Sequence, residues 1–430
     1  MKVINTTALV VLLSVGSANI YALDNVPDNI PQTWTQLGLM QGFPPAESKL
    51  VTKANYTQPP FNRWGLQHMR YLNFTAPIER GNLAVSQLTA KPQDLLTHKF
   101  MIDNKSQTLQ TFARQSYTDG LLVMHNGKIV TEWYDDGMTP ATAHWLASMT
   151  KSFVGTLGEL MIYQGKLDPQ KKVEYYIPEL KNSPFGSATV RQILDMDVGV
   201  VSDGYYQGLH ESGSYLNKFA KASGFLPSGE IVSSYDVLPT AKSVGANGGK
   251  FRYSSPTAEV AGWLISRVSK QPLEVVLSEQ IWSKLGTSGE AYTIVDSKSK
   301  MVSTGGLNLT LRDVARFGQM LANNGQFNGV QVLPIPVVRS VFAGGDKTTW
   351  INGDYSSMRP YINSYHSYWY QTDNQYHAVM AMGVYGQHLY IDPVNDIVIV
   401  KFASYPTQVV DAYDNGWLEV YPQLVKLLSK

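Results

Sequence analysis

Strand-forming segments occur in two regions of this chain, and a long helical stretch separates them. The first is GLLVMHNGKIVTEWYDDG at 120–137, where two alternating apolar runs flank Asn126-Gly127, the dipeptide typical of a two-residue hairpin turn. The second, at 377–405, reads HAVMAMGVYGQHLYIDP, then a turn at DPVND, then IVIVKFASY. Because such strands must pair to bury their apolar faces, the pattern predicts a mixed α/β fold whose sheet joins distant segments.

Helical periodicity fills the stretch between these regions. Residues 148–164 carry an apolar stripe that begins at Phe153, and Gly165 is suited to end that helix. Further helices are expected where Ser255-Pro256 opens a periodic run, at PLEVVLSEQIWSKLG, between a Thr310 and Asp313 cap and Gly325, and near 416–429.

The pattern divides the chain into four parts. Residues 1–22 are expected to be a signal peptide, and residues 23–115, which show little periodicity, an N-terminal wrapping extension. Residues 116–147 and 290–430 are expected to form the α/β domain, and residues 148–289 a mainly helical domain inserted into it. The active site is then expected between these two domains.

The amino terminus, MKVINTTALVVLLSVGSANIYALDN, has one lysine, a short apolar run and small residues that suit cleavage after Ala18 or Ala22. The apolar run is too short to span a bilayer, so no membrane anchor is expected after cleavage; a retained anchor helix is the alternative. This interpretation predicts a bacterial protein of the periplasm or the medium. The chain contains no cysteine, which excludes disulfides and lipid attachment through cysteine.

Composition limits the class of partner. The chain is 43% hydrophobic and 16% charged, as in compact globular proteins, and its formal net charge is only +1. Such a balance provides no field for nucleic acid or an anionic membrane, so a small-molecule substrate is expected. The sequence contains no Gly-x-Ser-x-Gly or His-Glu-x-x-His motif and no cysteine, and its histidines show no ligand spacing, so no metal or organic cofactor is expected.

A serine and a lysine lie three residues apart at the start of the predicted 148–164 helix. Residues at this spacing share a helix face, so the hydroxyl of Ser148 and the amine of Lys151 can meet. Burial lowers the pKa of a lysine, and a neutral amine beside a hydroxyl can take its proton. The helix start also favours developing negative charge. Ser148 is therefore a candidate acylating nucleophile.

The spacing alone is weak evidence, because Ser297 and Lys300 match it in a polar run without an apolar stripe. A second component is needed, such as a tyrosine that relays the proton to the leaving group. Tyrosines followed two residues later by Ser or Asn occur at Tyr215, Tyr355 and Tyr361, and spacing does not choose among them.

Several motifs in order resemble the serine β-lactamase and penicillin-binding protein superfamily, on the side of class C β-lactamases and related esterases. They are SMTKSF, FRYSSPTAEVAGWLISRVSKQPLEVVLSEQIWSKLG, GGLNLTLRDVARFGQMLANNG and GVYGQHLYIDP. With QPPFNRWGLQHMRYLNFTAPIERG and VRQILDMDVGV, the chain is most similar to 6-aminohexanoate-dimer hydrolases over residues 57–402. The resemblance implies a β-lactamase/transpeptidase-like fold, an antiparallel sheet flanked by helices with an inserted helical domain.

The resemblance also implies roles for individual residues. Ser148 would be the nucleophile, Lys151 its general base and Tyr253 the catalytic tyrosine, and the backbone N–H groups of Ser148 and Gln387 would form the oxyanion hole. The implied substrate-binding residues are Tyr206 or its neighbour Tyr205 as a lid tyrosine, Ser255 unless it is only a helix cap, Tyr385 and Gly386.

One position departs from the β-lactamase pattern. Val384-Tyr385-Gly386 stands where those enzymes carry Lys-Thr-Gly or His-Thr-Gly, so the cation that meets a substrate carboxylate is absent. The expected function is therefore an exported serine hydrolase that cleaves esters or linear amides of small molecules through an acyl-enzyme. A β-lactamase or D-alanyl-D-alanine carboxypeptidase, and a non-catalytic penicillin-binding-like protein, are the alternatives.

Overall fold

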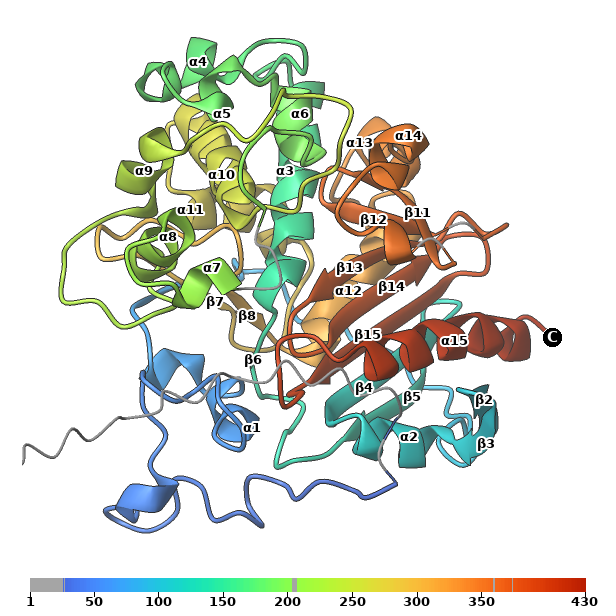
Figure 1. Ribbon diagram of the computed structural model, residues 1–430. Coiled ribbons are helices and arrows are strands. Elements are labelled where there is room, and N and C mark those ends of the chain that lie inside the picture. Colours follow the sequence, from blue (N-terminus) through green and yellow to red (C-terminus); the bar gives the residue numbers. More distant parts are fainter. Residues whose placement is uncertain (1–25, 27, 203–206, 359, 373) are drawn as a thin grey trace, which may run out of the picture.

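The computed structural model describes residues 26, 28–202, 207–358, 360–372 and 374–430 (Figure 1). The expected signal segment, residues 1–22, and both lid candidates, Tyr205 and Tyr206, lie outside the described residues. Among the described helices, none combines the length and the apolar character needed to cross a bilayer.

An antiparallel sheet of seven strands forms the centre of the fold, with the order β11-β12-β13-β14-β15-β4-β5. The pairing of β15 with β4 joins the two strand-forming regions of the sequence, so the predicted α/β class with a sheet built from distant segments is confirmed. The strands are β4 (Thr118–His125), β5 (Lys128–Tyr134), β11 (Ile362–His366), β12 (Trp369–Thr372), β13 (Val379–Gly383), β14 (Gln387–Asp392) and β15 (Ile397–Ala403).

Two turns of this sheet bear on the predictions. Asn126 (φ +51°) and Gly127 (φ +70°) form the expected left-handed turn between β4 and β5. The segment 377–393, expected as one strand-forming run, instead divides into β13 and β14 around a turn at 384–386, where φ is +64° at Tyr385 and +86° at Gly386.

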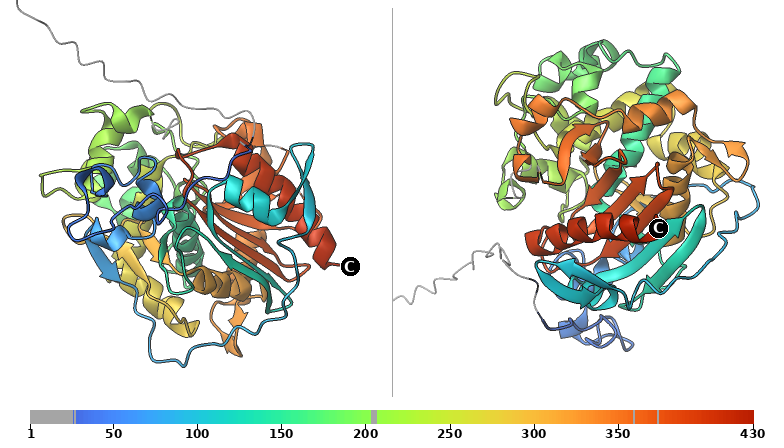
Figure 2. Two further views of the ribbon diagram at one scale, coloured as in Figure 1. Left: turned by 90° about the horizontal axis from the view of Figure 1, so that it is seen from below. Right: turned by 90° about the vertical axis from the view of Figure 1, so that its right-hand side faces the viewer.

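Helices cover both faces of the sheet (Figures 1 and 2). One face carries α12 (Leu311–Ala322), which approaches so closely that a Cβ on Gly318 would lie 2.6 Å from Cγ1 of Val398. The other face carries α15 (Asp411–Leu428), whose Tyr421 stacks on Tyr390 of β14 with ring centroids 5.2 Å apart. Side chains pointing in either direction from β14 and β15 are therefore buried.

The inserted region is mainly helical and centres on α3 (Thr150–Tyr163) and α10 (Ser255–Ser269), which pack together. Thr310 caps α12 by accepting from the N–H of Asp313, as predicted. Smaller helices are α4 (Val173–Tyr176), α5 (Pro184–Ser187), α6 (Val190–Leu194), α7 (Gln207–His210), α8 (Tyr215–Ala222), α9 (Ser234–Val237), α11 (Leu273–Gln280), α13 (Ile335–Phe342) and α14 (Lys347–Ile351). The 3₁₀ turns are η1 (Glu47–Lys49), η2 (Met69–Tyr71), η3 (Ala147–Met149), η4 (Pro178–Leu180), η6 (Leu238–Thr240), η7 (Trp282–Lys284) and η8 (Ser356–Met358).

The N-terminal part of the chain is fixed to the body at several points. The buried guanidinium of Arg63 forms ion pairs with Asp136 (3.0 Å) and Asp119 (3.7 Å). A four-stranded sheet joins this part to the centre in the order β1-β7-β8-β6. The remaining elements are α1 (Asn62–Gly65), α2 (Leu109–Gln115), β1 (Thr75–Pro77), β2 (Lys99–Ile102), β3 (Lys105–Thr108), β6 (His144–Trp145), β7 (Tyr292–Ile294), β8 (Leu307–Leu309), β9 (Gln326–Phe327) and β10 (Val330–Gln331).

Candidate active site

Ser148 lies in η3, the short turn between β6 and the long helix α3. The preceding residue, Ala147, is buried and has φ +46°, in the left-handed region that residues other than glycine rarely adopt. The turn is held from outside by the N–H of Leu146, which donates to the carbonyl of Leu307 at 2.9 Å. A strained, well-supported turn at a helix start is a typical setting for a functional side chain.

Lys151 is buried, with only 1% of its surface exposed. Its Nζ lies 2.8 Å from Oγ of Ser148 and donates to the carbonyl of Thr304 at 2.7 Å. The same Nζ lies 5.0 Å from the centroid of the Tyr253 ring. The structure therefore brings together Ser148, Lys151 and Tyr253, the three residues that the sequence singled out for catalysis.

Tyr253 precedes α10 and is 4% exposed. Its N–H donates to Oδ2 of Asp354 at 3.1 Å, and its ring stacks on Tyr355 at 5.1 Å. Of the tyrosines that spacing left open, Tyr355 lines the same pocket as Tyr253 and Ser148. The ring of Tyr253 also lies beside Nζ of Lys151.

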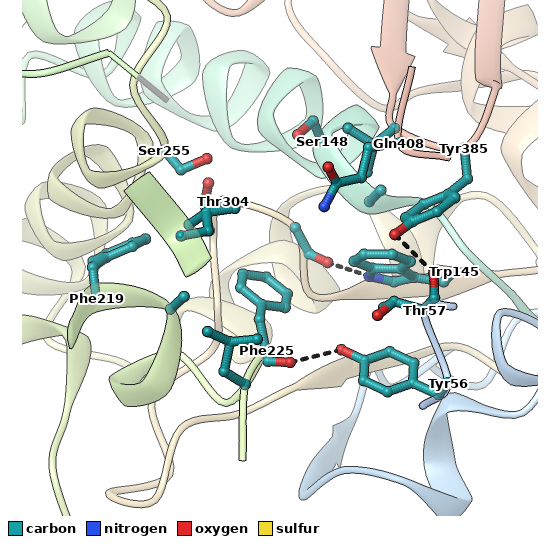
Figure 3. A pocket seen from close by; sticks show the side chains of 16 residues that line it. Tyr56, Thr57, Trp145, Ser148, Phe219, Phe225, Ser255, Thr304, Tyr385 and Gln408 are labelled. Carbon is teal, nitrogen blue, oxygen red and sulfur yellow. Dashed lines mark hydrogen bonds between the residues drawn. The ribbon is translucent and has the colours of Figure 1, made fainter. Parts of the chain in front are cut away.

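Two pockets flank Ser148, and both are also lined by Val384 and Gln408. The first, which we call the aromatic pocket, encloses an empty volume of about 800 Å³, which includes its open mouth (Figure 3). Its described lining contains no Asp, Glu, Lys, Arg or His. Its walls are Tyr56, Thr57, Trp145, Ala147, Ser148, Leu209, Phe219, Ala220, Phe225, Leu226, Ser255, Thr304, Gly305, Val384, Tyr385 and Gln408.

The second, which we call the acidic pocket, encloses an empty volume of about 920 Å³, which includes its open mouth. Its charged lining residues within the described chain are Asp411 and Asp414, both in the first turn of α15. Burial, together with the charge of Asp414, raises the pKa of Asp411. The rest of the lining is Ser148, Tyr253, Tyr355, Ser357, Met358, Tyr370, Met382, Gly383, Val384, Gln408, Val409, Asn415 and Leu418.

Buried groups anchor Asp414 from behind the acidic pocket. Its Oδ1 accepts from the hydroxyl of Tyr405 at 3.1 Å and lies 3.3 Å from Nε2 of His388. Burial lowers the pKa of His388 to about 4, which leaves the imidazole neutral at neutral pH. These contacts hold the side chain of Asp414 at the wall of the acidic pocket, which Ser148 also lines.

The oxyanion-hole expectation needs a correction at its second residue. Gln387 is fully buried and pairs with Gly383 between β14 and β13, while its side-chain Nε2 donates to the carbonyl of Ala403 at 2.6 Å. It lines neither pocket that contains Ser148, whereas Val384 lines both.

The two glycines of the GVYG segment are each needed for a different physical reason. A Cβ on Gly383 would lie 2.4 Å from the carbonyl oxygen of Leu146, so this glycine lets the strand approach the nucleophile turn. A Cβ on Gly386 would lie 2.3 Å from Cζ of Tyr405. The expectation that Gly386 lies against substrate is therefore wrong, because an aromatic ring of the protein fills that space and Gly386 lines neither pocket.

The other two expected substrate-binding residues do line the aromatic pocket. The hydroxyl of Tyr385 donates to the carbonyl of Thr57 at 3.2 Å, and burial raises the pKa of Tyr385 well above its usual value. Ser255 is the first residue of α10 and not its cap, because the N-cap position is occupied by Ser254. Figure 3 shows Ser255 and Tyr385 on different sides of Ser148.

Sequence reasoning missed residues that come from distant segments. Tyr56 and Thr57 belong to the N-terminal part, and the hydroxyl of Tyr56 donates to the carbonyl of Phe225 at 3.1 Å. Thr304 and Gly305 lie on the loop before β8, where Nε1 of Trp145 donates to the carbonyl of Gly305 at 2.5 Å. The adjacent Gly305-Gly306 pair was the one local signal of a close backbone approach in this loop.

Fold and site together define a hydrolase of the β-lactamase-like superfamily. The chain belongs to the β-lactamase family, whose model, described as Beta-lactamase, matches residues 106–420.

The chain is also similar to individual relatives and solved structures. The 6-aminohexanoate-dimer hydrolase of Paenarthrobacter ureafaciens is 29% identical over 366 residues, which cover 85% of this chain and 91% of the relative. A solved Bacillus anthracis structure, assigned as a 6-aminohexanoate-dimer hydrolase, is 30% identical with a TM-score of 0.79 and covers 89% of this chain and 98% of its own. A Bacteroides dorei structure assigned as a β-lactamase is 15% identical with a TM-score of 0.55, covers 72% and 95%, and shares the fold alone.

Proposed function

We propose that this protein is an exported serine hydrolase that cleaves linear amide or ester bonds of small molecules through an acyl-enzyme on Ser148. The observation that carries the proposal is the contact between the buried amine of Lys151 and the hydroxyl of Ser148, 2.8 Å apart where two pockets meet. Similarity to 6-aminohexanoate-dimer hydrolases supports a linear amide as the substrate class.

Acylation follows from the positions of the three side chains. Oγ of Ser148 attacks the substrate carbonyl while its proton passes to Nζ of Lys151. The tetrahedral intermediate collapses, and the proton reaches the leaving group through the hydroxyl of Tyr253, whose ring lies beside Lys151. Water then attacks the acyl-enzyme, which releases the acid and returns the proton to Ser148.

The negative charge on the intermediate needs hydrogen-bond donors that are fixed in advance. We assign this role to the N–H groups of Ser148 and Val384, because both residues line both pockets. One such donor is typically worth about 3 kcal/mol in the transition state. Gly383 supports this arrangement by allowing β13 to contact the nucleophile turn.

The charges around the site favour some substrates over others. The described lining of both pockets contains no Lys or Arg, and the acidic pocket carries Asp411 and Asp414. A β-lactam or a D-alanyl-D-alanine peptide would bring a carboxylate into this setting without a cation to meet it. A neutral or amine-bearing linear substrate meets no such penalty, which favours an amidase or esterase over a β-lactamase.

Export is part of the proposal and rests on the amino-terminal pattern of one lysine, a short apolar run and small residues. The absence of cysteine is compatible with either an oxidising or a reducing compartment. Fractionation of the native host, with mass determination of the mature amino terminus, tests it. Cleavage after Ala18 or Ala22 is expected, and a full-length chain in the cytoplasm would contradict it.

A substrate panel tests the catalytic proposal. The purified protein is assayed with p-nitrophenyl esters, linear amides including the 6-aminohexanoate dimer, and nitrocefin. Ser148→Ala is expected to lower kcat by about 10³-fold or more, the scale seen when a nucleophile is removed. Ser297→Ala is the matched control, because Ser297 is also followed three residues later by a lysine. It is exposed and lines neither pocket. Nitrocefin as the best substrate would contradict the proposed class.

A further inference from the structure

A buried carboxylate of α10 lies behind the Ser148–Lys151 pair. Glu259 has no exposed surface, and its Oε2 accepts from the N–H of Thr304 at 3.1 Å and from the hydroxyl of Ser303 at 2.9 Å. The carbonyl of the same Thr304 accepts from Nζ of Lys151 at 2.7 Å. One residue of the loop before β8 therefore contacts Glu259 through its amide and Lys151 through its carbonyl.

This loop is fixed on two sides. On the α10 side, Ser303 is packed so tightly that a Cβ on Gly262 would lie 2.5 Å from its Oγ. On the nucleophile side, the N–H of Leu307 donates to Oγ1 of Thr150 at 3.1 Å. Thr304 lies between these contacts in a turn, and its N–H and its carbonyl belong to adjacent peptide units. The unit of the carbonyl also carries the N–H of Gly305, which donates to the carbonyl of Val302 at 3.3 Å. The carbonyl direction therefore depends on how the whole turn is held, which includes the bond from the Thr304 N–H to Glu259.

The surroundings of Glu259 provide neutral donors. Besides Thr304 and Ser303, the hydroxyl of Ser234 donates to Oε1 at 3.1 Å. The titratable groups that face Glu259 include Asp296, Tyr235 and Tyr368. Burial above all, with a contribution from Asp296, raises the pKa of Glu259 to about 7. An apolar side chain of similar size would avoid burying a carboxyl group but would leave these donors without an acceptor, so what the carboxyl group adds is its hydrogen-bond acceptors.

We propose that Glu259 is a positioning residue that, by holding the N–H of Thr304, fixes the carbonyl that orients the Lys151 amine toward Ser148. It acts through Lys151 and touches no substrate, since it lines neither pocket. The inference rests on the proposed roles of Ser148 and Lys151. Loss of Glu259 is therefore expected to impair the chemical step and not substrate binding.

Two substitutions at Glu259 separate the acceptor from the charge. Glu259→Gln keeps an oxygen for Thr304 and offers its NH₂ group to the serine hydroxyls, so kcat is expected to stay within about 3-fold of the wild type. Glu259→Leu removes the acceptor and is expected to lower kcat by about 100-fold with KM nearly unchanged, the scale of an ångström-sized misplacement. If kcat of Glu259→Gln fell as far as that of Glu259→Leu, the charge of Glu259 and not its positioning role would explain the loss, and the inference would be overturned.

A variant outside Glu259 keeps the test decisive if Glu259→Leu fails to fold. Gly262→Ala pushes against Ser303 and so displaces the loop while Glu259 is retained, and about a 10-fold lower kcat is expected. Gly229→Ala is its control, because a Cβ on Gly229 meets nothing within 4 Å. Folding is checked by urea unfolding.

Lower stability at unchanged kcat in the folded Glu259→Leu and Gly262→Ala variants would overturn the inference. Ser148→Ala, run in the same assay, separates the two proposals. If Ser148→Ala retains turnover, the proposed function fails first. If Ser148→Ala is inactive while folded Glu259→Leu keeps the kcat of the wild type, the positioning role alone fails.

Discussion

The ring of Tyr405 occupies the space that a side chain on Gly386 would need, since a Cβ there would lie 2.3 Å from Cζ of the tyrosine. The hydroxyl of the same ring accepts from Nζ of Lys401 at 2.6 Å and donates to Asp414 at 3.1 Å. The turn that carries Val384 and the carboxylate of Asp414 in the acidic pocket therefore both contact one buried tyrosine.

Gly386→Ala is expected to displace this turn. The glycine has φ +86°, so alanine costs about 1 kcal/mol of backbone strain, and the contact with Tyr405 adds about 1–3 kcal/mol of overpacking. Gly329→Ala is the matched control, because φ is +78° there and a Cβ meets nothing within 4 Å. Urea unfolding and kcat are measured for both. Equal losses in the two variants would show that Tyr405 does not constrain the turn.

Tyr253→Phe is expected to lower kcat by about 10²–10⁴-fold, the usual contribution of a positioned acid or base. The ring, its packing and its contact with Lys151 remain, so folding is retained. Tyr355→Phe provides the comparison, because Tyr355 stacks on Tyr253 at 5.1 Å and lines the same pocket. A larger loss of kcat at Tyr355 than at Tyr253 would transfer the relay role to Tyr355.

Asp411→Lys is expected to change substrate preference. A cation in the acidic pocket would offer a partner to a substrate carboxylate, so kcat/KM for carboxylate-bearing substrates should rise by about 3-fold or more relative to uncharged ones, from a solvent-screened charge change of ~1 kcal/mol. Glu47→Lys, at an exposed residue of η1, makes the same change in net charge elsewhere. If both variants shift the ratio equally, the effect is one of overall charge and the pocket assignment is contradicted.

The stability of the protein is expected to decrease as pH rises, because of Glu259. The pKa of this carboxyl group is raised by burial from 4.5 to about 7, so the folded state keeps the proton over a range where the unfolded state releases it. The stabilisation is fully present below about pH 4.5 and is lost as pH rises toward 7, with a slope of at most about 1.4 kcal/mol per pH unit. Urea unfolding at pH 5, 6 and 7 should show a steeper decline for the wild type than for Glu259→Gln. Parallel declines would contradict this.

Much of the fold could be predicted from local signals. Asn126-Gly127 gave the hairpin, the apolar stripe after Ser148 gave α3, and Thr310 with Asp313 gave the start of α12. These features depend on periodicity and turn chemistry within a few residues. The turn at 384–386 was missed, because its only local signals are Gly383 and Gly386, and no Asn, Asp or Pro occurs between Val379 and Ile391.

For the site as well, features set by nearby residues were predicted and features set by distant segments were missed. The contact between Ser148 and Lys151 follows from their spacing of three residues across the start of α3 and was predicted. The placement of Gln387 and Gly386 was not, because a position within an antiparallel pair depends on register, and register is fixed by the partner strand. Thr304 and Glu259 come together only through tertiary packing, for which the sequence has no local signal.

Labelling of the nucleophile tests the central claim most directly. The protein is treated with a fluorophosphonate probe, digested and mapped by mass spectrometry, alongside Ser148→Ala, Lys151→Ala and the control Ser297→Ala. The account predicts one adduct on Ser148, formed about 10²-fold or more slowly in Lys151→Ala, absent in Ser148→Ala and unchanged in Ser297→Ala. An adduct that persists in Ser148→Ala, or labelling that is equally fast without the Lys151 amine, would contradict it.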